Sequence, residues 1–205
     1  MPSSPKSSKP TRPSRFPSPS MNTLPDYLQP GLDIVLVGIN PSQISVQRGH
    51  YFANPRNRFW PAFNRSGLVP VPLSSDQDHT LPAYGIGFTD VVKRPSSQAS
   101  ALTPQDFRQW APILKQKLLQ SRPMIVCFHG LMACNGYLLY AENSKAKATL
   151  GLQPASIGQS TVFVVPNPSP TNAQFSLDTL VNWYKQLKTL RDQLKLTWTP
   201  PSVPS

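Results

Sequence analysis

Asp33-Ile-Val-Leu-Val-Gly38 is a continuous apolar run that ends at a glycine. A run of this length, without alternating polar residues, is typical of a strand that a parallel sheet buries on both faces. Two similar runs follow, Met124-Ile-Val-Cys-Phe-His129 and Thr161-Val-Phe-Val-Val165. We therefore expect three strands of one mostly parallel sheet.

Helical patterns separate these runs. Asn57–Ser66 and Pro104–Gln120 are predicted helices, the second with Thr103 as its N-cap, and another helix follows His129 to about residue 142. Gly85–Val92 is expected to form a short strand or a loop. The closing helix has an apolar stripe at three- and four-residue steps, made by Leu177, Leu180, Val181, Tyr184, Leu187, Leu190 and Leu194. This alternation predicts an α/β fold, a three-layer α/β/α sandwich around a short, mostly parallel central sheet.

The two ends of the chain differ in composition from its middle. Residues 1–25 are almost entirely Ser, Pro, Thr and basic residues, and such a segment cannot bury enough apolar surface to offset its ordering entropy. We expect a disordered basic tail over residues 1–25, one folded domain over 26–197 and a loose end over 198–205. The tail could clamp DNA, direct the chain to the nucleus or an organelle, or act as a plain spacer.

The charge of the chain favours one class of partner. Its 205 residues include 20 Lys and Arg against nine Asp and Glu, a formal net charge of +11. This balance suits a polyanion, although a solvated basic surface would give the same count.

Residues for metal or membrane contact are scarce. Cys127 and Cys134 are too few for a four-cysteine cluster or zinc site, and the three histidines lack metal-ligand spacing. No apolar run reaches the length of a membrane span. We expect no metal site and no membrane contact, and free thiols in a reduced compartment.

Three segments that follow predicted strands could carry chemistry, because sites in parallel sheets form beyond the carboxyl ends of the strands. The first, Gly38-Ile-Asn-Pro-Ser42, presents the Asn40 amide after a tight turn, although Asn-Pro is also an ordinary turn dipeptide. The third, Val165–Asn172, has three prolines alternating with small polar residues. Such a rigid loop could enter a groove, or it could be a surface turn without a role.

The second segment, Arg48–Trp60, interleaves basic residues with aromatic rings, and no acidic residue occurs from Ile34 through Ser75. Cations for phosphates and flat rings for an unstacked base are typical of nucleic-acid contact. Phe59 and Trp60 are expected to begin a helix and join the core. Phe52 is the better candidate for stacking on a base.

Taken together, these segments resemble the mismatch-specific uracil-DNA and thymine-DNA glycosylases, members of the uracil-DNA glycosylase superfamily. The pieces that carry the resemblance occur in the family's order over roughly residues 27–195: 38–41, 49–52, 57–60, 85–94, 165–169, 173–175 and 187–195. The resemblance implies a DNA glycosylase that flips a base from duplex DNA and hydrolyses its bond to the sugar with water. It also implies G·U or G·T mispairs as substrates, no cofactor and a monomer. The basic tail suits the nucleus of a eukaryote, with a bacterial cytoplasm as the alternative.

The resemblance assigns roles to individual residues. Asn40 matches the asparagine that positions the attacking water, and Phe52 matches the ring that stacks on the flipped base. The other base-pocket residues by this comparison are Ile39, Ser45, Asp90 and Asn167. The expected wedge residues are Ser169, Pro170, Thr171 and Asn172. Independently of the resemblance, the basic and aromatic pattern of the second segment gives Arg48, Arg56 and Arg58 as expected DNA contacts.

Two of these positions depart from the family. Thr171 stands at the wedge where a leucine or an arginine is frequent, and Asp90 stands where the compared members have lysine or asparagine. A carboxylate at residue 90 could accept the N3–H of uracil or thymine but would repel a carbonyl edge.

Two alternative functions come from other classes. A non-catalytic protein could bind mismatched or damaged DNA with the same pocket and basic loops. A small-molecule α/β enzyme is the other alternative, but no Gly-x-Gly-x-x-Gly or Walker-type loop follows any strand.

Overall fold

The structure is a computed structural model that describes residues 22–198. Its centre is a five-stranded sheet with the strand order β2-β1-β3-β5-β4. The strands are β1 (Ile34–Gly38), β2 (Ile86–Asp90), β3 (Ile125–His129), β4 (Gly151–Ile157) and β5 (Ser160–Val165). Neighbouring strands run parallel except β4, which pairs antiparallel with β5. The three apolar strands predicted from the sequence are confirmed, and 85–92 contains a strand.

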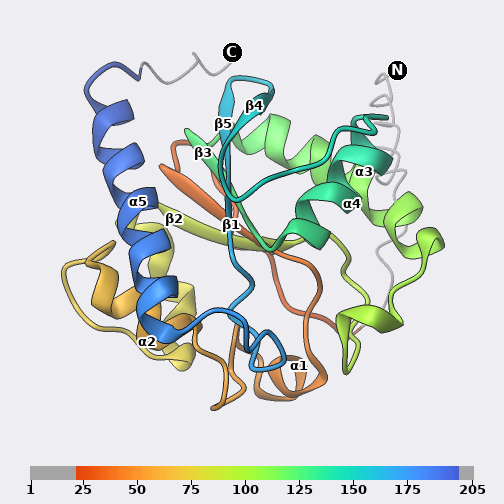
Figure 1. Ribbon diagram of the computed structural model, residues 1–205, viewed down its shortest axis with the longest axis horizontal. Helices are drawn as coiled ribbons and strands as arrows, with labels where there is room; N and C mark the ends of the chain where they lie inside the picture. The colour runs from red at the N-terminus through yellow and green to blue at the C-terminus, as the bar shows by residue number, and fades with distance from the viewer. Residues whose placement is uncertain (1–21, 199–205) are drawn as a thin grey trace, which may run out of the picture.

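Helices cover both faces of the sheet. They are α1 (Gln43–Arg48), α2 (Phe59–Ser66), α3 (Pro104–Ser121), α4 (Leu131–Ala141) and α5 (Leu177–Lys195), with 3-10 segments at Ser75–Tyr84 and Ala99–Ala101. Figure 1 shows α2 and α5 on one side of the sheet and α3 and α4 on the other. The predicted three-layer α/β/α sandwich is confirmed.

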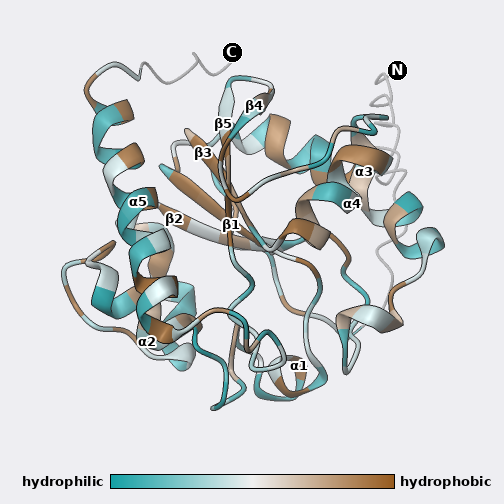
Figure 2. Cartoon of the chain, in the orientation of Figure 1, coloured by the Kyte–Doolittle hydropathy of each residue, from teal (hydrophilic) through white to brown (hydrophobic). Residues whose placement is uncertain are grey.

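Two cores result from strands that are apolar on both faces. In β1, Ile34 and Leu36 pack toward α2 and α5, whereas Val35 and Val37 pack toward α3 and α4. All four side chains are fully buried. In Figure 2, β1 and β3 are accordingly largely brown, while α5 shows both teal and brown along its length. Burial of the sheet on both sides leaves its ends as the places where loops can form a site.

Local sequence sets where two helices begin. Thr103 caps α3: its hydroxyl accepts the Asp106 N–H, the Asp106 carboxylate accepts the Thr103 N–H at 2.8 Å, and the predicted N-cap is confirmed. Helix α2 begins at Phe59 and not at the predicted Asn57. The Asn57 side-chain oxygen instead accepts the Phe59 N–H at 2.9 Å, which makes residue 57 part of the turn that precedes the helix.

The edge strand β4 was not predicted. It contains Pro154, pairs only with β5, and its register shifts between Leu152 and Ser156. Proline lacks an N–H donor and is tolerated in a sheet only at an edge or an irregularity. A short, mostly exposed stretch that contains proline lacks the residue pattern from which a strand is predicted.

The predicted domain boundary at residue 26 can be compared with the first described residues. The Thr23 hydroxyl donates to the Lys93 carbonyl at 2.7 Å, and Leu24 is buried in the core, so packing begins slightly before that boundary. Most of the predicted tail (1–25) and most of the predicted loose end (198–205) lie outside the described residues. Among helices within 22–198, none is long and apolar enough to cross a membrane.

Gly87 allows a segment near the N-terminus to pair with β2. Tyr27 exchanges two backbone hydrogen bonds with Phe88, at 2.9 and 3.2 Å. A methyl group on Gly87 would collide with the Tyr27 carbonyl oxygen and lie 2.7 Å from the Leu32 side chain. This close approach requires the absence of a side chain at position 87.

Gly87→Ala is therefore expected to lower the free energy of unfolding by about 1–3 kcal/mol, because the added methyl group forces the buried backbone apart. Urea denaturation measures the change. The exposed strand residue Ser156 provides the control, since Ser156→Ala should change stability by less than about 0.5 kcal/mol. Equal stability of the two variants would contradict the packing argument.

Candidate active site

A cleft of about 250 Å³ opens where three parallel strands end. Ile39 follows β1, His129 ends β3 and Gly130 follows it, and Asn167 lies beyond β5. The remaining walls come from Ala99, Leu131, Met132, Ala133, Leu150, Pro166, Asn172, Gln174 and Phe175. Of the predicted site residues, Ile39, Asn167 and Asn172 line this cleft.

Asn40 is oriented by three acceptors. Its amide nitrogen donates to the Ser96 hydroxyl at 2.8 Å, the Arg94 carbonyl at 3.1 Å and the Pro41 carbonyl at 3.2 Å. Carbonyl oxygens can only accept, so these contacts determine which end of the amide is nitrogen. The amide oxygen remains as the group that can accept a hydrogen bond from a water molecule beside the cleft residue Ile39.

Phe52 is held in an unusual backbone conformation. Its φ of +53° lies in the left-handed region, which a bulky side chain rarely adopts. The ring stacks on Phe59 with centroids 4.2 Å apart and lies 5.2 Å from the His129 ring. Strain of this kind persists only where the surroundings impose it. Phe52 is therefore fixed against a wall of the cleft, and Phe59 joins the core as predicted.

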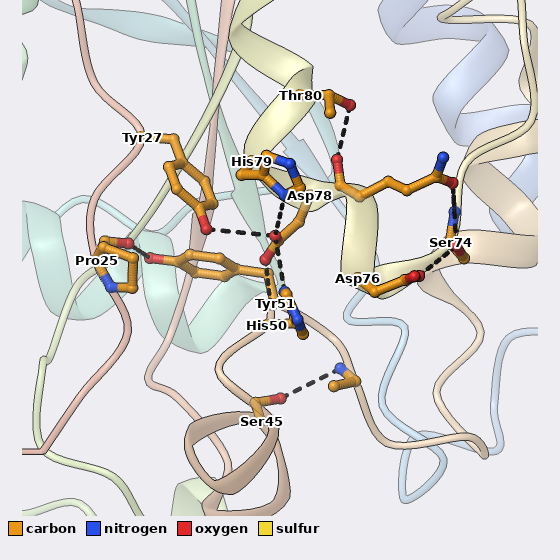
Figure 3. A network of polar contacts seen from close by, with 12 residues as sticks. Pro25, Tyr27, Ser45, His50, Tyr51, Ser74, Asp76, Asp78, His79 and Thr80 are labelled. Carbon is orange, nitrogen blue, oxygen red and sulfur yellow. Dashed lines mark hydrogen bonds and ion pairs between the residues drawn. The ribbon is translucent and has the colours of Figure 1, made fainter.

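The buried carboxylate of Asp78 imposes the conformation of the segment that precedes Phe52. It accepts the Tyr51 N–H at 2.7 Å and the Tyr27 hydroxyl at 3.3 Å, and it lies 3.0 Å from Nδ1 of His50. Figure 3 shows these three residues meeting at Asp78. Asp78 was not predicted as a site residue, because nothing in the order of residues indicates that position 78 reaches back to position 51.

Ser45 fixes the segment that follows Phe52. Its hydroxyl oxygen accepts the Ala53 N–H at 3.3 Å and the hydroxyl of Ser42, the N-cap of α1, at 3.0 Å. Ser45 is buried, so its observed contacts position the loop and do not face the cleft.

Asp90 lies beneath the site in a buried charge cluster. Lys93 Nζ is 2.8 Å from Asp26 but 3.8 Å from Asp90 Oδ2, and within residues 22–198 that oxygen has no hydrogen-bond partner. Burial raises the pKa of Asp90 to about 7; Lys93 opposes this shift and the Asp26 charge adds to it. Burial would also raise the pKa of Asp26, but Lys93 and Lys117 lower it overall. Of the two carboxylates near Lys93, Asp26 is therefore ionised below pH 7, where Asp90 is largely neutral.

The predicted wedge loop is ordered by its own polar groups. The Asn167 side-chain oxygen accepts the Ser169 N–H, and the Asn172 amide donates to the Asn167 carbonyl, both at 2.9 Å. Pro170 and Thr171 form the exposed tip. The loop therefore has a defined shape with a narrow end that faces solvent.

The three predicted DNA-binding arginines lie in different surroundings. Arg56 is exposed, and Arg48 is exposed while donating to the Ala53 carbonyl at 3.0 Å. Arg58 differs from the expectation of a direct DNA contact: both of its terminal nitrogens donate to backbone carbonyls of the 169–175 loop. A guanidinium occupied in this way has little capacity left for a phosphate.

His129 also lines the cleft, although the sequence predicted it only as the end of a strand. Its Nε2 lies 3.0 Å from the Tyr184 hydroxyl. Burial lowers the pKa of His129 to about 4, and the Val37 carbonyl only partly offsets this effect. The ring is therefore neutral near pH 7, and it supplies an uncharged wall to the cleft. Within the described part of the chain, no group of three or more His, Cys, Asp or Glu could hold a metal ion.

The fold agrees with comparisons to known proteins, which define the class: a DNA glycosylase, a hydrolase that cuts the bond between base and sugar. The chain belongs to the uracil DNA glycosylase superfamily, whose family model matches residues 25–191. This membership favours an enzyme over the non-catalytic and small-molecule alternatives.

A solved structure supports the fold. It is the solution NMR structure of a protein from Methanosarcina acetivorans, provisionally described as a uracil DNA glycosylase. The similarity has a TM-score of 0.55 at 22% identity and covers 85% of this chain and 98% of that one.

The environment of Asp90 predicts a pH effect on stability. With a pKa raised from 3.8 to about 7, the folded protein binds this proton more tightly than the unfolded chain does. The stabilisation is complete below pH 4 and is lost as the pH rises through 7. Asp90→Asn, which mimics the neutral acid, should raise the free energy of unfolding at pH 8 by about 4 kcal/mol at most and change it little at pH 4.

Denaturation of both proteins at pH 4, 6 and 8 measures this difference. The exposed Asp76→Asn variant removes the same charge elsewhere and should not reproduce the pH dependence. A less stable Asp90→Asn protein at pH 8 would show that the charged carboxylate stabilises the fold through Lys93.

Proposed function

We propose that this enzyme is a mismatch-specific glycosylase that removes uracil from G·U mispairs in duplex DNA, with thymine and modified cytosines opposite guanine as further candidate substrates. The observation that carries the proposal is the Asn40 amide. Its nitrogen is bound by three acceptors, which leaves its oxygen to position a water molecule next to the cleft. Base-pocket roles of Ile39, Phe52 and Asn167 are part of the same proposal, and Ser45 and Asp90, which do not line the cleft, would support the pocket from behind.

Selectivity for mispairs follows from the cost of extrusion. A base inside a duplex must leave the stack before it can react, and this costs a few kcal/mol, least for a mispaired base. Phe52 would then stack on the extruded pyrimidine, an interaction that tolerates different bases because each has a flat face. Discrimination between uracil and thymine would depend on the pocket walls.

The chemical step breaks the bond between the base nitrogen and the anomeric carbon. The electron pair leaves with the base, the sugar develops oxocarbenium character, and water adds to the anomeric carbon and loses a proton. The products are the free base and an abasic site. The Asn40 oxygen can orient the water but cannot take its proton, so the general-base contribution of about 10²–10⁴-fold is missing and a slow enzyme is expected.

We also predict that the protein is a monomer. Its predicted location is the nucleus if the source is a eukaryote, or else a bacterial cytoplasm.

Asn40→Ala should lower the rate of uracil release from a G·U duplex by about 100-fold or more, because the water loses its orienting acceptor. DNA affinity, measured by fluorescence anisotropy, should change little. Ser96→Ala removes one of the three acceptors that hold the amide and should cause a smaller loss of rate. Unchanged uracil release by Asn40→Ala would remove this residue from the mechanism.

Lesion preference can be measured directly. Duplexes that contain G·U, G·T, ethenocytosine or hypoxanthine are incubated with the protein and assayed for abasic sites. We expect the fastest release from G·U. An A·U duplex of the same sequence is the control, since its uracil is harder to extrude. Equal rates for A·U and G·U would contradict the preference for mispairs.

A further inference from the structure

Arg58 joins two segments that lie far apart in the sequence. It directly precedes α2, and its guanidinium reaches the loop after β5. Nη2 donates to the Ser169 carbonyl at 2.9 Å and to the Asn172 carbonyl at 2.8 Å, and Nη1 donates to the Phe175 carbonyl. The Arg58 N–H also donates to the Pro168 carbonyl at 3.2 Å. One residue therefore binds four carbonyls of the loop.

These carbonyls lie on both sides of the exposed tip. Pro168 and Ser169 precede Pro170 and Thr171, and Asn172 and Phe175 follow them. A planar guanidinium has a rigid fork of donors, so it can fix the relative positions of several acceptors at once. Arg58 thereby holds together the two sides of the loop at its base.

The surroundings of the Arg58 guanidinium are unfavourable for a charged side chain. Among residues 22–198, Nε of Arg58 is buried without a hydrogen-bond partner, and no carboxylate forms an ion pair with the guanidinium. Arg58 is half-buried, and a partly desolvated charge without a carboxylate and with an unpaired donor destabilises a fold unless its remaining contacts compensate. The carbonyls of the loop are the groups that supply those contacts.

The short side chain of Thr171 makes the shape of the backbone important. A long side chain at the tip could fill the gap left by an extruded base even from a mobile loop. Threonine cannot extend far, so the backbone and Pro170 must enter the gap themselves. A wedge made of backbone can separate stacked bases only if the loop keeps its conformation when it enters the duplex.

We infer that Arg58 is a positioning residue for base extrusion: it holds the wedge loop 169–172 in the shape that enters the duplex. The inference rests on the proposed function, because it takes the loop to be a wedge. It replaces the direct DNA contact that the sequence predicts for Arg58.

The test compares Arg58→Ala on two DNA substrates. One has uracil in a G·U pair, and the other has uracil in an unpaired bubble of the same duplex, where extrusion costs less. Release from the G·U pair should fall about 10- to 100-fold, because several charge-assisted hydrogen bonds to the loop are lost. Release from the bubble should fall by much less. A merely structural defect would lower both rates equally.

Two further variants sharpen the comparison. Arg56→Ala removes the same charge from the same segment without touching the loop carbonyls, so any loss should be similar on both substrates. Arg58→Lys keeps the charge but lacks the planar fork, so it should recover only part of the G·U rate. It also serves as the test variant if Arg58→Ala fails to fold.

Hydrogen–deuterium exchange of residues 167–175 in free protein provides a readout independent of activity. Faster exchange in the Arg58 variant, together with selective loss on the G·U pair, is the expected result. Unchanged exchange, equal losses on both substrates, or no loss on either would overturn the inference. If the wild type releases uracil from neither substrate, the proposed function fails, and exchange alone then decides whether Arg58 holds the loop.

Discussion

The parallel pairing of β1 with β3, and of β3 with β5, is the constraint on which the site depends. It places the residues after Gly38, His129 and Val165 at one edge of the sheet, although they are spread over more than half of the chain. Apolar side chains on both faces of these strands fix the register against the two helical layers. The strand order therefore brings these loops together at the carboxyl end of the sheet, and the cleft does not depend on contacts between the loops.

Each loop at that edge is held by polar groups from elsewhere in the sequence. Ser96 and the Arg94 carbonyl orient Asn40, the Asp78 carboxylate holds the backbone before Phe52, and Arg58 binds the loop after β5. Hydrogen bonds that involve a charged group are stronger than neutral ones. A site that must act on an extruded base gains from such preorganisation, because the reacting groups are already in place when the base arrives.

The sequence predicted the features that local pattern or ordered motifs encode. Buried apolar strands, the Thr103 cap and the stripe of α5 follow from residue spacing, and the resemblance indicated Asn40 and Phe52. Sequence patterns did not indicate contacts between distant residues. Asp78 and Ser96 belong to segments without a distinctive pattern. Strand β4 contains Pro154, which does not fit the residue pattern of a strand. Arg58 was expected to contact DNA because of its charge, but charge alone could not distinguish a phosphate partner from the carbonyls it binds.

The Arg58 contacts also bear on how the protein folds. They close loops of more than 110 residues, with separations of 111, 114 and 117 between the partners. Contacts of such long range contribute stabilisation only after most of the intervening chain has collapsed. The loop after β5 should consequently acquire its native geometry late on the folding pathway, and partial opening of the native state could release it while the central strands stay protected.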